Sequence, residues 1–396
     1  MQELKLLEKN KDIKNLKVFL RVDFNVPMQN QAVSDSTKIT KVKTIVEDLL
    51  NRGAVVILCS HLGRPQVKGK EGFSLEPVRS EAEKIIGREI VFVAEDFKNI
   101  ISQKISENKN LFLLENIRFD PNEEKNGDEL SKKLADLCDI YINEAFSCSH
   151  RKHASIFGIT QFVDSYAGET IHQELTALNS IVTGTQKPVA CLIGGSKIST
   201  KIDLITSLMP KIDYMIIGGA MANNFFKHQG FQVGKSKIEE NIDSVIKNII
   251  ATASKNNCKL VLPIDVVTAK TFEDQGVNKT LDQVEDDEMI LDIGTETIAS
   301  ISKILQESKT VFWNGPFGFF EKDSFANGTK EISNTVADLT KQGKLVSIAG
   351  GGDTFAAIKK SKRENEFTYI STAGGAFLEW LEGKVLPGLK VLEIKN

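Results

Sequence analysis

Residues 345–358 read LVSIAGGGDTFAAI. The apolar run at 345–348 is typical of a buried strand, and three glycines, Asp353 and Thr354 separate it from the start of a helix. Glycine lets backbone N–H groups approach an anion, and the positive end of the following helix favours negative charge. Asp353 adds a hard oxygen ligand suited to Mg²⁺. The stretch therefore predicts a strand–loop–helix unit that binds the phosphate chain of a nucleotide.

Several other site motifs are missing from the chain. No G-x-x-x-x-G-K-[ST] run occurs, which excludes a P-loop, and GGGDTF has Phe355 where a dinucleotide-binding turn needs its last glycine. There is no G-x-S-x-G elbow and no H-E-x-x-H helix. Cys148, His150 and His153 lie close in sequence, but without a fourth nearby ligand they do not predict a zinc site.

Apolar runs alternate with helix-like segments along the whole chain. Their nearly continuous apolar character indicates strands buried on both faces, and the intervening helices favour parallel sheets of the doubly wound type. The predicted strands lie at 17–24, 54–60, 89–96, 111–119 and 139–146 in the first half, and at 188–194, 213–219, 258–265, 310–315, 344–351 and 366–372 in the second.

The stretch 167–184 separates the two halves, and its apolar spacing suits one helix that ends at Gly184. We therefore expect an α/β protein with two doubly wound, mostly parallel-sheet, Rossmann-like lobes joined by a helix or hinge. The expected boundaries are 1–168 for the N-terminal lobe, 169–184 for the connector and 185–380 for the C-terminal lobe. The alternative is one large sheet with an ordinary helix in its middle.

Composition limits the function. The chain has 396 residues, of which 41% are hydrophobic and 26% charged, and its formal net charge is −3. No global charge favours nucleic acid or a membrane surface, and no apolar stretch approaches the ~18 residues of a membrane span. The charged N-terminus does not read as a secretory signal, and five scattered cysteines without a C-x-x-C pair favour a reducing compartment. We expect a cytoplasmic protein.

The strand ends of the first half carry charge. In open parallel sheets, ligands bind beyond the carboxyl ends of the strands. The polar residues at these ends are Arg21, Asp23, Asn25, His61, Arg64, Arg118, His150, Arg151 and His153. Because a guanidinium matches phosphate and carboxylate, this basic rim predicts a small, multiply anionic ligand. The alternative is that each arginine makes only a structural ion pair.

The strand ends of the second half are rich in glycine, which favours a nucleotide phosphate chain over the alternative of tight helix–sheet packing alone. Lys197 and Lys201 are four residues apart, so they are predicted to project from one face of the following helix. The glycine-rich ends are 193–201, 217–222, 313–321, 349–354 and 371–375.

Together these motifs resemble the phosphoglycerate kinase family over essentially the whole chain. The family's motifs appear in order as RVDFNVP (21–27), SHLGRP (60–65), FSLEPV (73–78), ENIRF (115–119), HRKHAS (150–155), GGSKISTKI (194–202), WNGPFGFFE (313–321), GGGDT (350–354) and STAGGAFLEWLEGKVLPG (371–388). The resemblance implies a monomeric kinase that moves a phosphoryl group reversibly between 1,3-bisphosphoglycerate and ADP, giving 3-phosphoglycerate and ATP. It also implies Mg²⁺ with the nucleotide, closure of a hinge, and a C-terminal segment, 381–396, that packs back on the N-terminal lobe.

The same resemblance implies the site residues. Phosphoglycerate contacts are expected from Asp23, Phe24, Asn25, Lys38, His61, Leu62, Gly63, Arg64, Arg118 and Arg151. Nucleotide contacts are expected from Lys197, Lys201, Glu321, Gly351, Gly352, Asp353 and Thr354, with Asp353 on Mg²⁺ directly or through water. Lys38, Lys201, Gly374 and Gly375 are expected to act on the transferring phosphoryl group.

The chain departs from the family pattern at a few positions. Lys38 stands where the family has arginine, Thr295 replaces a proline and Ala373 replaces a glycine. The stretch EAFSCSH (144–150) replaces the usual DAFGTAH. Only Lys38 touches an implied catalytic role.

Such a reaction needs no general base, because both nucleophiles are already ionised at neutral pH. Catalysis then reduces to alignment and to neutralising charge on the transferring group. Two other classes remain as alternatives at this point. One is a two-lobed, non-catalytic binding protein for a phosphorylated metabolite, and the other is a dinucleotide-dependent dehydrogenase.

Overall fold

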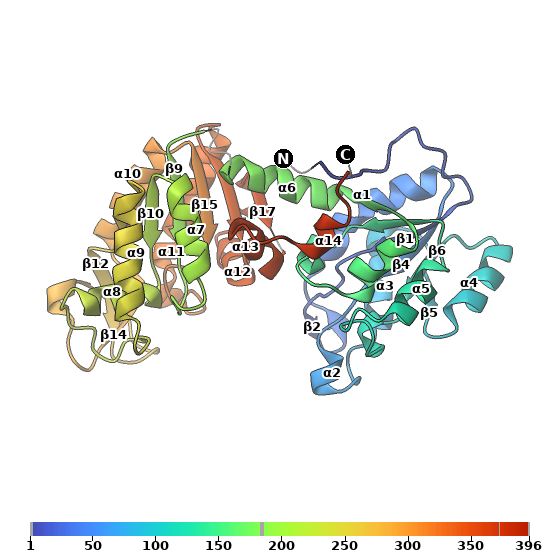
Figure 1. The fold of residues 1–396 in the computed structure, drawn as a ribbon. Helices are drawn as coiled ribbons and strands as arrows, with labels where there is room; N and C mark the ends of the chain where they lie inside the picture. The colour runs from blue at the N-terminus through green and yellow to red at the C-terminus, as the bar shows by residue number, and fades with distance from the viewer. Residues whose placement is uncertain (1–2, 183–185, 372, 395–396) are drawn as a thin grey trace. The chain divides into compact units, whose positions relative to one another are not determined.

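The protein, seen in a computed structural model, is described over residues 3–182, 186–371 and 373–394. It divides into two compact units: unit 1 comprises residues 1–175 and 385–396, and unit 2 comprises residues 176–384. Each unit is built on a six-stranded parallel sheet with helices packed on it (Figure 1). The predicted fold class is confirmed, and the alternative of one large sheet is wrong.

The sheet of unit 1 has the order β5-β6-β4-β1-β7-β8. Its strands are β1 (Lys17–Arg21), β4 (Val55–Cys59), β5 (Val91–Val93), β6 (Leu111–Leu114), β7 (Ile140–Asn143) and β8 (Asp164–Ala167). A hairpin of β2 (Met28–Gln29) and β3 (Ala32–Val33) follows β1. The α-helices are α1 (Thr37–Asn51), α2 (Pro65–Lys68), α3 (Glu76–Ile86), α4 (Phe97–Ser106), α5 (Asp128–Ala135) and, from the C-terminal segment, α14 (Pro387–Lys390).

Strand β1 shows why the sheet is covered on both faces. Val18 and Leu20 belong to one apolar core, whereas Phe19 belongs to a second core together with Tyr141. Successive side chains of a strand point to opposite faces, so a fully apolar strand must have a core on each side. The continuous apolar run in the sequence is the signature of this arrangement.

The sheet of unit 2 has the order β11-β10-β9-β15-β16-β17. Its strands are β9 (Val189–Ile193), β10 (Tyr214–Ile217), β11 (Lys259–Val261), β15 (Thr310–Asn314), β16 (Val346–Gly350) and β17 (Tyr369–Ser371). A separate antiparallel sheet has the order β13-β12-β14, made of β12 (Asp265–Ala269), β13 (Val277–Thr280) and β14 (Met289–Ile293). The helices are α7 (Ile202–Leu208), α8 (Ala220–His228), α9 (Asp243–Lys255), α10 (Thr295–Glu307), α11 (Asn327–Lys341), α12 (Gly352–Lys360) and α13 (Gly375–Leu381).

All eleven predicted strands are present within their predicted ranges. The sequence analysis missed the β2–β3 hairpin, β8 and the antiparallel sheet of unit 2. Helix α6 (Glu169–Val182) occupies the stretch expected to connect the halves, and the division between the units falls within it. Its predicted end at Gly184 lies outside the described residues.

The C-terminal segment belongs to unit 1 (Figure 1). Leu386, Leu389 and Leu392 are buried there. The Lys5 N–H donates to the Leu392 carbonyl at 2.8 Å, so this segment lies against the first described residues of the chain. No helix in the described residues combines the length and apolar character that crossing a membrane requires.

Candidate active site

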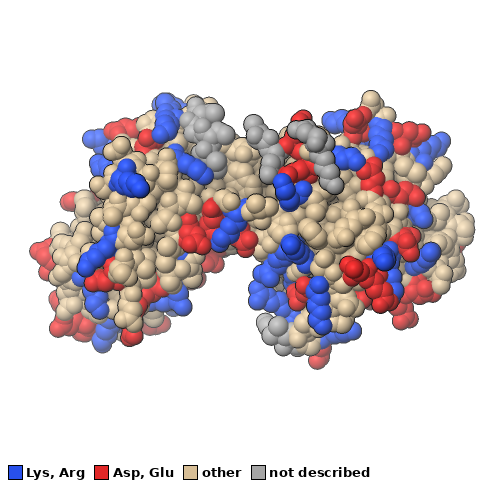
Figure 2. Space-filling model, in the orientation of Figure 1, with Lys and Arg blue, Asp and Glu red and all other residues tan. Residues whose placement is uncertain are grey.

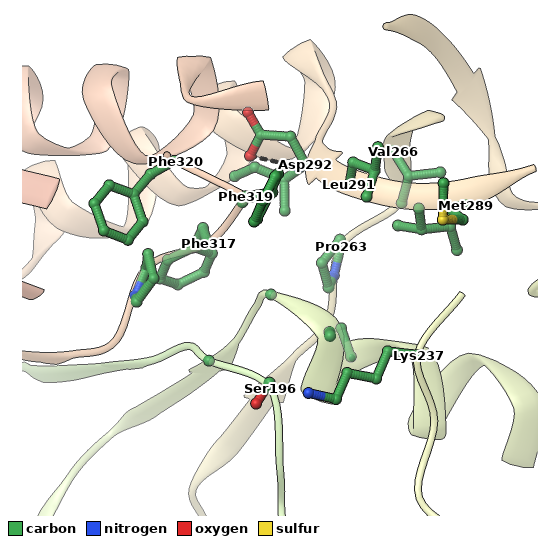
Figure 3. Close-up of a pocket in the computed structure, with 18 of the residues that line it drawn as sticks. Ser196, Lys237, Pro263, Val266, Met289, Leu291, Asp292, Phe317, Phe319 and Phe320 are labelled. Atoms are coloured by element: carbon green, nitrogen blue, oxygen red, sulfur yellow. Dashed lines mark hydrogen bonds between the residues drawn. The ribbon is translucent and has the colours of Figure 1, made fainter. Parts of the chain in front are cut away.

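Unit 2 places its strand ends around a topological switch point. Strands β9 and β15 are neighbours, and the chain leaves them toward opposite sides of the sheet, so a crevice opens beyond their carboxyl ends. A cavity of about 590 Å³ lies in this unit, and Figure 3 shows part of its lining. Its size is that of a small-molecule site.

One wall of the cavity is apolar. Phe226 comes from α8, Met289 and Leu291 come from β14, and Phe317 and Phe319 come from the loop after β15. Flat apolar walls suit the stacking of an aromatic ring such as a nucleotide base. Much of this wall comes from the antiparallel sheet that the sequence analysis missed. The run MILDI (289–293) was the available signal, but it was not recognised as a strand.

Of the loop with which the sequence analysis began, only Asp353 lines the cavity. Gly351 caps α12 with a φ of 103°, a backbone conformation that favours glycine. Asp353 lies exposed in the first turn of α12 and lines the cavity. Predicted contact residue Thr354 is instead buried, and its hydroxyl donates to the Gly350 carbonyl at 2.8 Å and accepts the Gly315 N–H at 2.7 Å. Thr354 therefore ties two glycine loops together.

Asn314, at the end of β15, was missed by the sequence analysis. Its side-chain amide donates to the Gly350 carbonyl at 2.5 Å, and its Oδ1 atom is buried without a hydrogen-bond partner among the described residues. Asn314 therefore fixes the loop after β16 from the neighbouring strand. In the motif WNG (313–315) the glycine marks the strand end, whereas nothing in the local sequence marks the asparagine as a structural residue.

The expectation that Lys197 and Lys201 share a helix face is wrong. Helix α7 begins at Ile202, Lys201 is its N-cap residue, and Lys197 is exposed in the preceding turn. The carboxylate of Glu239 accepts the backbone N–H groups of Ile198, at 2.5 Å, and Ser199, at 3.3 Å. A side chain from a distant segment thus satisfies these donors, and the helix starts later than the spacing suggested.

The ammonium group of Lys201 lies at the switch point itself. It donates to the carbonyls of Gly194, at 2.8 Å, and Asn314, at 3.2 Å, the residues at the ends of β9 and β15. Burial lowers the pKa of Lys201 to about 8, although the Asp353 carboxylate opposes that shift. The Lys201 ammonium is therefore held between the ends of β9 and β15. Because its pKa is about 8, it begins to lose its proton just above neutral pH.

Three further residues of unit 2 were predicted to contact the nucleotide or the phosphoryl group, and only one of them lines the cavity. Glu321 is exposed and lines the cavity. Gly374 and Gly375 do not line it; they form the start of α13, where Gly374 has a φ of 55°. Their N–H groups belong to the positive end of a helix.

Unit 1 assembles a second polar cluster beyond the end of β1. The Lys38 ammonium donates to the Asp23 carboxylate at 2.7 Å and to the Asn25 carbonyl at 3.2 Å. The Ser147 hydroxyl donates to the same carboxylate at 2.6 Å. Burial is the largest single effect and opposes ionisation of Asp23, but the Lys38 charge and the hydrogen bonds from Lys38 and Ser147 act together to hold the pKa of the carboxyl below its usual range. Lys38 is thus fixed in the predicted basic rim.

Two histidines of this rim, His61 and His153, add no positive charge to it. His61 is buried with Nδ1 3.4 Å from Nη2 of Arg21, and burial together with that guanidinium drives its pKa far below the ordinary value. Burial also lowers the pKa of His153 to about 3. Both imidazoles are therefore neutral near pH 7, and His61 offers hydrogen bonds rather than charge.

The three arginines differ in their pairing. Arg118 donates to the Gly63 carbonyl at 2.7 Å and pairs with Glu124 at 3.2 Å. Arg64 and Arg151 are exposed, and neither pairs with a carboxylate among the described residues. Figure 2 shows Lys and Arg side chains gathered on unit 1 around β2 and α2. The ion-pair alternative therefore fits Arg118 but not the other two.

The other predicted residues of unit 1 shape the rim. Phe24 and Leu62 are buried in the apolar core, so their side chains support the loops without presenting polar atoms. Gly63 has a φ of 60°, and a Cβ there would lie 2.2 Å from the ring of Phe73. Its N–H donates to Oδ1 of Asn25 at 2.9 Å. Glycine is required at this position by both conformation and space.

A parallel sheet with a glycine-lined cavity in one unit, and unpaired guanidinium groups in the other, are the features expected of nucleotide-dependent phosphotransferases. The chain belongs to the phosphoglycerate kinase family, whose model matches residues 8–384.

Individual relatives agree with this assignment. A phosphoglycerate kinase of Wolbachia pipientis is 44% identical over 383 residues, covering 96% of both chains. One from Bartonella quintana is 45% identical over 386 residues, covering 96% of this chain and 97% of its own. The solved structure of phosphoglycerate kinase from Coxiella burnetii matches with a TM-score of 0.86 at 35% identity, over 98% of each chain.

The reaction is therefore the reversible transfer of a phosphoryl group between 1,3-bisphosphoglycerate and ADP, which gives 3-phosphoglycerate and ATP in glycolysis and gluconeogenesis. None of the comparisons supports the non-catalytic binding protein or the dehydrogenase that the sequence had left open.

Proposed function

We propose that the two units divide the substrates between them. Unit 1 binds phosphoglycerate through Arg64, Arg118 and Arg151, with Asp23, Asn25 and His61 as hydrogen-bonding partners. Unit 2 binds the nucleotide in its cavity, with the base on the apolar wall and the ribose near Glu321. Lys197, Lys201 and the loop 351–353 take the phosphates. The single observation that carries this proposal is the cavity that joins an apolar wall to two glycine-rich strand ends.

Magnesium fits Asp353 as one protein ligand beside nucleotide phosphates. Mg²⁺ usually keeps several waters and takes one or two carboxylates together with phosphate oxygens. Asp353 is exposed and makes no hydrogen bond through its carboxylate to the described residues, so its oxygens are available. In the described ranges no group of three or more His, Cys, Asp and Glu side chains is gathered, so the phosphates would complete the coordination. When bound, the ion supplies positive charge at the phosphate chain.

The chain's own residues supply alignment and charge. Lys38 and Lys201 bring cations from the two units to the transferring group, and the N–H groups of Gly374 and Gly375 add fixed dipoles. No general base is assigned, because the attacking oxygen is ionised. Since donor and acceptor are held by different units, the units must close on each other to exclude water from the acyl phosphate.

A coupled assay tests the assignment of substrates. Purified enzyme with ATP, Mg²⁺ and 3-phosphoglycerate should form 1,3-bisphosphoglycerate, detected by a reductive coupling enzyme. Replacement of 3-phosphoglycerate by glycerate removes the phosphate that the arginines should hold, and activity should disappear. Equal activity with glycerate would contradict the role of the basic rim.

Asp353→Asn tests the metal assignment. The amide keeps the shape but loses the charge, so Mg-ADP affinity should fall by about tenfold or more while metal-free ADP affinity changes little. Calorimetric titrations with and without Mg²⁺ measure both. If both affinities fall by the same factor, Asp353 acts on the nucleotide without the ion.

We also propose that the enzyme is a cytoplasmic monomer. Cys59, Cys138, Cys148, Cys191 and Cys258 are free thiols, which supports a reducing compartment. Light scattering coupled to size-exclusion chromatography should give a mass near 43.8 kDa.

A further inference from the structure

Two lysines, Lys235 and Lys237, line the unit 2 cavity. Lys237 lies on the segment between α8 and α9 and contributes to the cavity lining. The hydroxyl of its neighbour Ser236 accepts the Ile290 N–H of β14 at 2.8 Å, while Glu239 holds the turn at Ile198. The segment therefore runs from the apolar wall to the loop after β9. In Figure 3 the ammonium end of Lys237 extends along the cavity toward Ser196.

Strand order indicates which part of a nucleotide reaches Lys237. Asp353 follows β16, whereas the segment with Lys237 follows β10 through α8. In the order β10-β9-β15-β16 these strands are three spacings apart, or about 14 Å at about 4.8 Å each. A nucleotide with its terminal phosphates near Asp353 extends its base toward the β10 side. The segment that carries Lys237 therefore lies on the side of the base, and its ammonium reaches from there along the cavity.

The chemistry of lysine limits what it can recognise there. An ammonium group has three donors and no acceptor. Guanine offers two neighbouring acceptors, N7 and O6, whereas adenine offers N7 beside an amino group that is itself a donor. Lys237 is exposed, and its ammonium has no ion-pair partner among the described residues. Its donors are thus free to read the edge of a purine.

We propose that Lys237 is a specificity-determining residue that donates a hydrogen bond to the 6-carbonyl oxygen of a purine. The apolar wall alone would bind any purine by stacking. Lys237 adds affinity for guanine and hypoxanthine nucleotides, which carry that oxygen, and none for adenine nucleotides. The inference rests on the proposed nucleotide site in this cavity.

Calorimetry with ADP and GDP tests this inference. Lys237→Met keeps much of the length and apolar contact of the side chain but removes its donors. We expect GDP affinity to fall about tenfold and ADP affinity to fall less than about twofold. Lys247→Met, on the exposed face of α9, makes the same change in net charge away from the cavity and should leave the ratio of the two affinities unchanged.

Two results would overturn the inference. An equal loss for GDP and ADP in Lys237→Met would show that the lysine acts on the phosphates, and no loss for either would show that it faces solvent. If the proposed nucleotide site in this cavity is wrong, the result is different. Lys237→Met and Asp353→Asn would then both leave the two affinities unchanged, or the wild-type enzyme would bind neither nucleotide. Wild-type enzyme that binds ADP but no GDP also contradicts the proposed contact.

Discussion

Lys38 stands where the resemblance to the family implies an arginine. The structure holds its ammonium between the Asp23 carboxylate and the Asn25 carbonyl, so the side chain is pre-positioned in the rim. Lysine keeps the charge of the family's arginine but offers a point charge in place of a planar fork. Charge neutralisation should therefore persist while geometric control of the phosphoryl group weakens.

We expect Lys38→Ala to lower kcat by about 10²-fold or more, with a much smaller change in phosphoglycerate affinity. The reason is that the contact should strengthen in the transition state. Lys38→Arg should be as active as wild type or faster. Steady-state kinetics measure both, and Lys43→Ala is the control because Lys43 is half-buried and pairs only loosely with Glu47, at 3.8 Å. Near-normal kcat in Lys38→Ala would move the role to another lysine, such as Lys41.

Lys201 predicts a pH dependence of nucleotide binding. Because burial lowers its pKa to about 8, the free enzyme loses this cation as the pH rises through that value. ADP affinity should therefore be nearly full at pH 7, begin to fall as the pH approaches 8, and weaken above it by up to about tenfold per pH unit. Lys201→Arg, which stays charged, should remove most of this slope. Calorimetric titrations with ADP from pH 7 to 9.5 measure the affinity of each protein. If wild type and Lys201→Arg lose affinity in parallel, a group other than Lys201 is responsible for the pH dependence.

The sequence predicted which residues carry charge, but not their protonation or pairing. Asp353 lies beyond the end of β16 and Arg64 beyond the end of β4, because ligand-facing residues of a parallel sheet follow the carboxyl ends of its strands. The neutral state of His61 depends on burial beside Arg21, and the late start of α7 depends on Glu239, about forty residues away. Both are tertiary effects that a local pattern does not contain.

At the scale of elements, the N-terminus of α6 depends on one buried carboxyl group. Oε1 of Glu144 accepts the Thr170 N–H at 2.9 Å, while its Oε2 is buried without a partner among the described residues. Burial raises the pKa of Glu144 to about 7. Its protonated form is therefore favoured by folding, even though ionised carboxylates usually suit a helix N-terminus.

This shift predicts how stability changes with pH. The folded pKa lies above the unfolded value of 4.5, so the stabilisation is fully present below about pH 4.5 and is lost as the pH rises through about 7. Over this whole range, the free energy of unfolding should fall by on the order of 3 kcal/mol because of Glu144. Glu144→Gln, which cannot ionise, should show a flatter decline in the free energy of unfolding between pH 5 and 8. Urea titrations at several pH values measure this, and identical slopes would contradict the assignment.

The sequence located the elements of the two parallel sheets more completely than those of the antiparallel sheet. Strands such as β4 and β9 are buried at every position and read as continuous apolar runs. Strand β13, in contrast, reads VNKT and is largely exposed, so neither apolar pattern nor burial marks it. Strand β13 forms because it pairs with β12, which its own sequence does not indicate. The cavity wall was missed for another reason, because β14 reads as the apolar run MILDI but does not follow an α-helix, as most strands of the parallel sheets do.

At the scale of the molecule, unit 1 is discontinuous in sequence. Removal of residues 385–396 would delete the buried Leu386, Leu389 and Leu392, each worth roughly 1.5–3 kcal/mol. We expect the truncated chain to lose the stability of unit 1 while unit 2 still binds ADP.

The two tryptophans make this measurable, because Trp313 and Trp380 both belong to unit 2. In urea, tryptophan fluorescence reports unit 2, whereas far-UV circular dichroism reports both units. The truncated protein should show an early dichroism transition that the fluorescence lacks. Coincident transitions at the wild-type midpoint would show that the segment contributes little.

The pairing of both ends of the chain within unit 1 has a consequence for biosynthesis. A ribosome makes residues 1–175 first, but the segment that completes their fold leaves the exit tunnel only after all of unit 2 has been made. The nascent first unit must wait through some 210 residues of synthesis with its surface for Leu386, Leu389 and Leu392 uncovered, about 10–40 s at 5–20 residues per second. During translation this enzyme therefore presents a binding surface for chaperones that the finished molecule covers with its own chain.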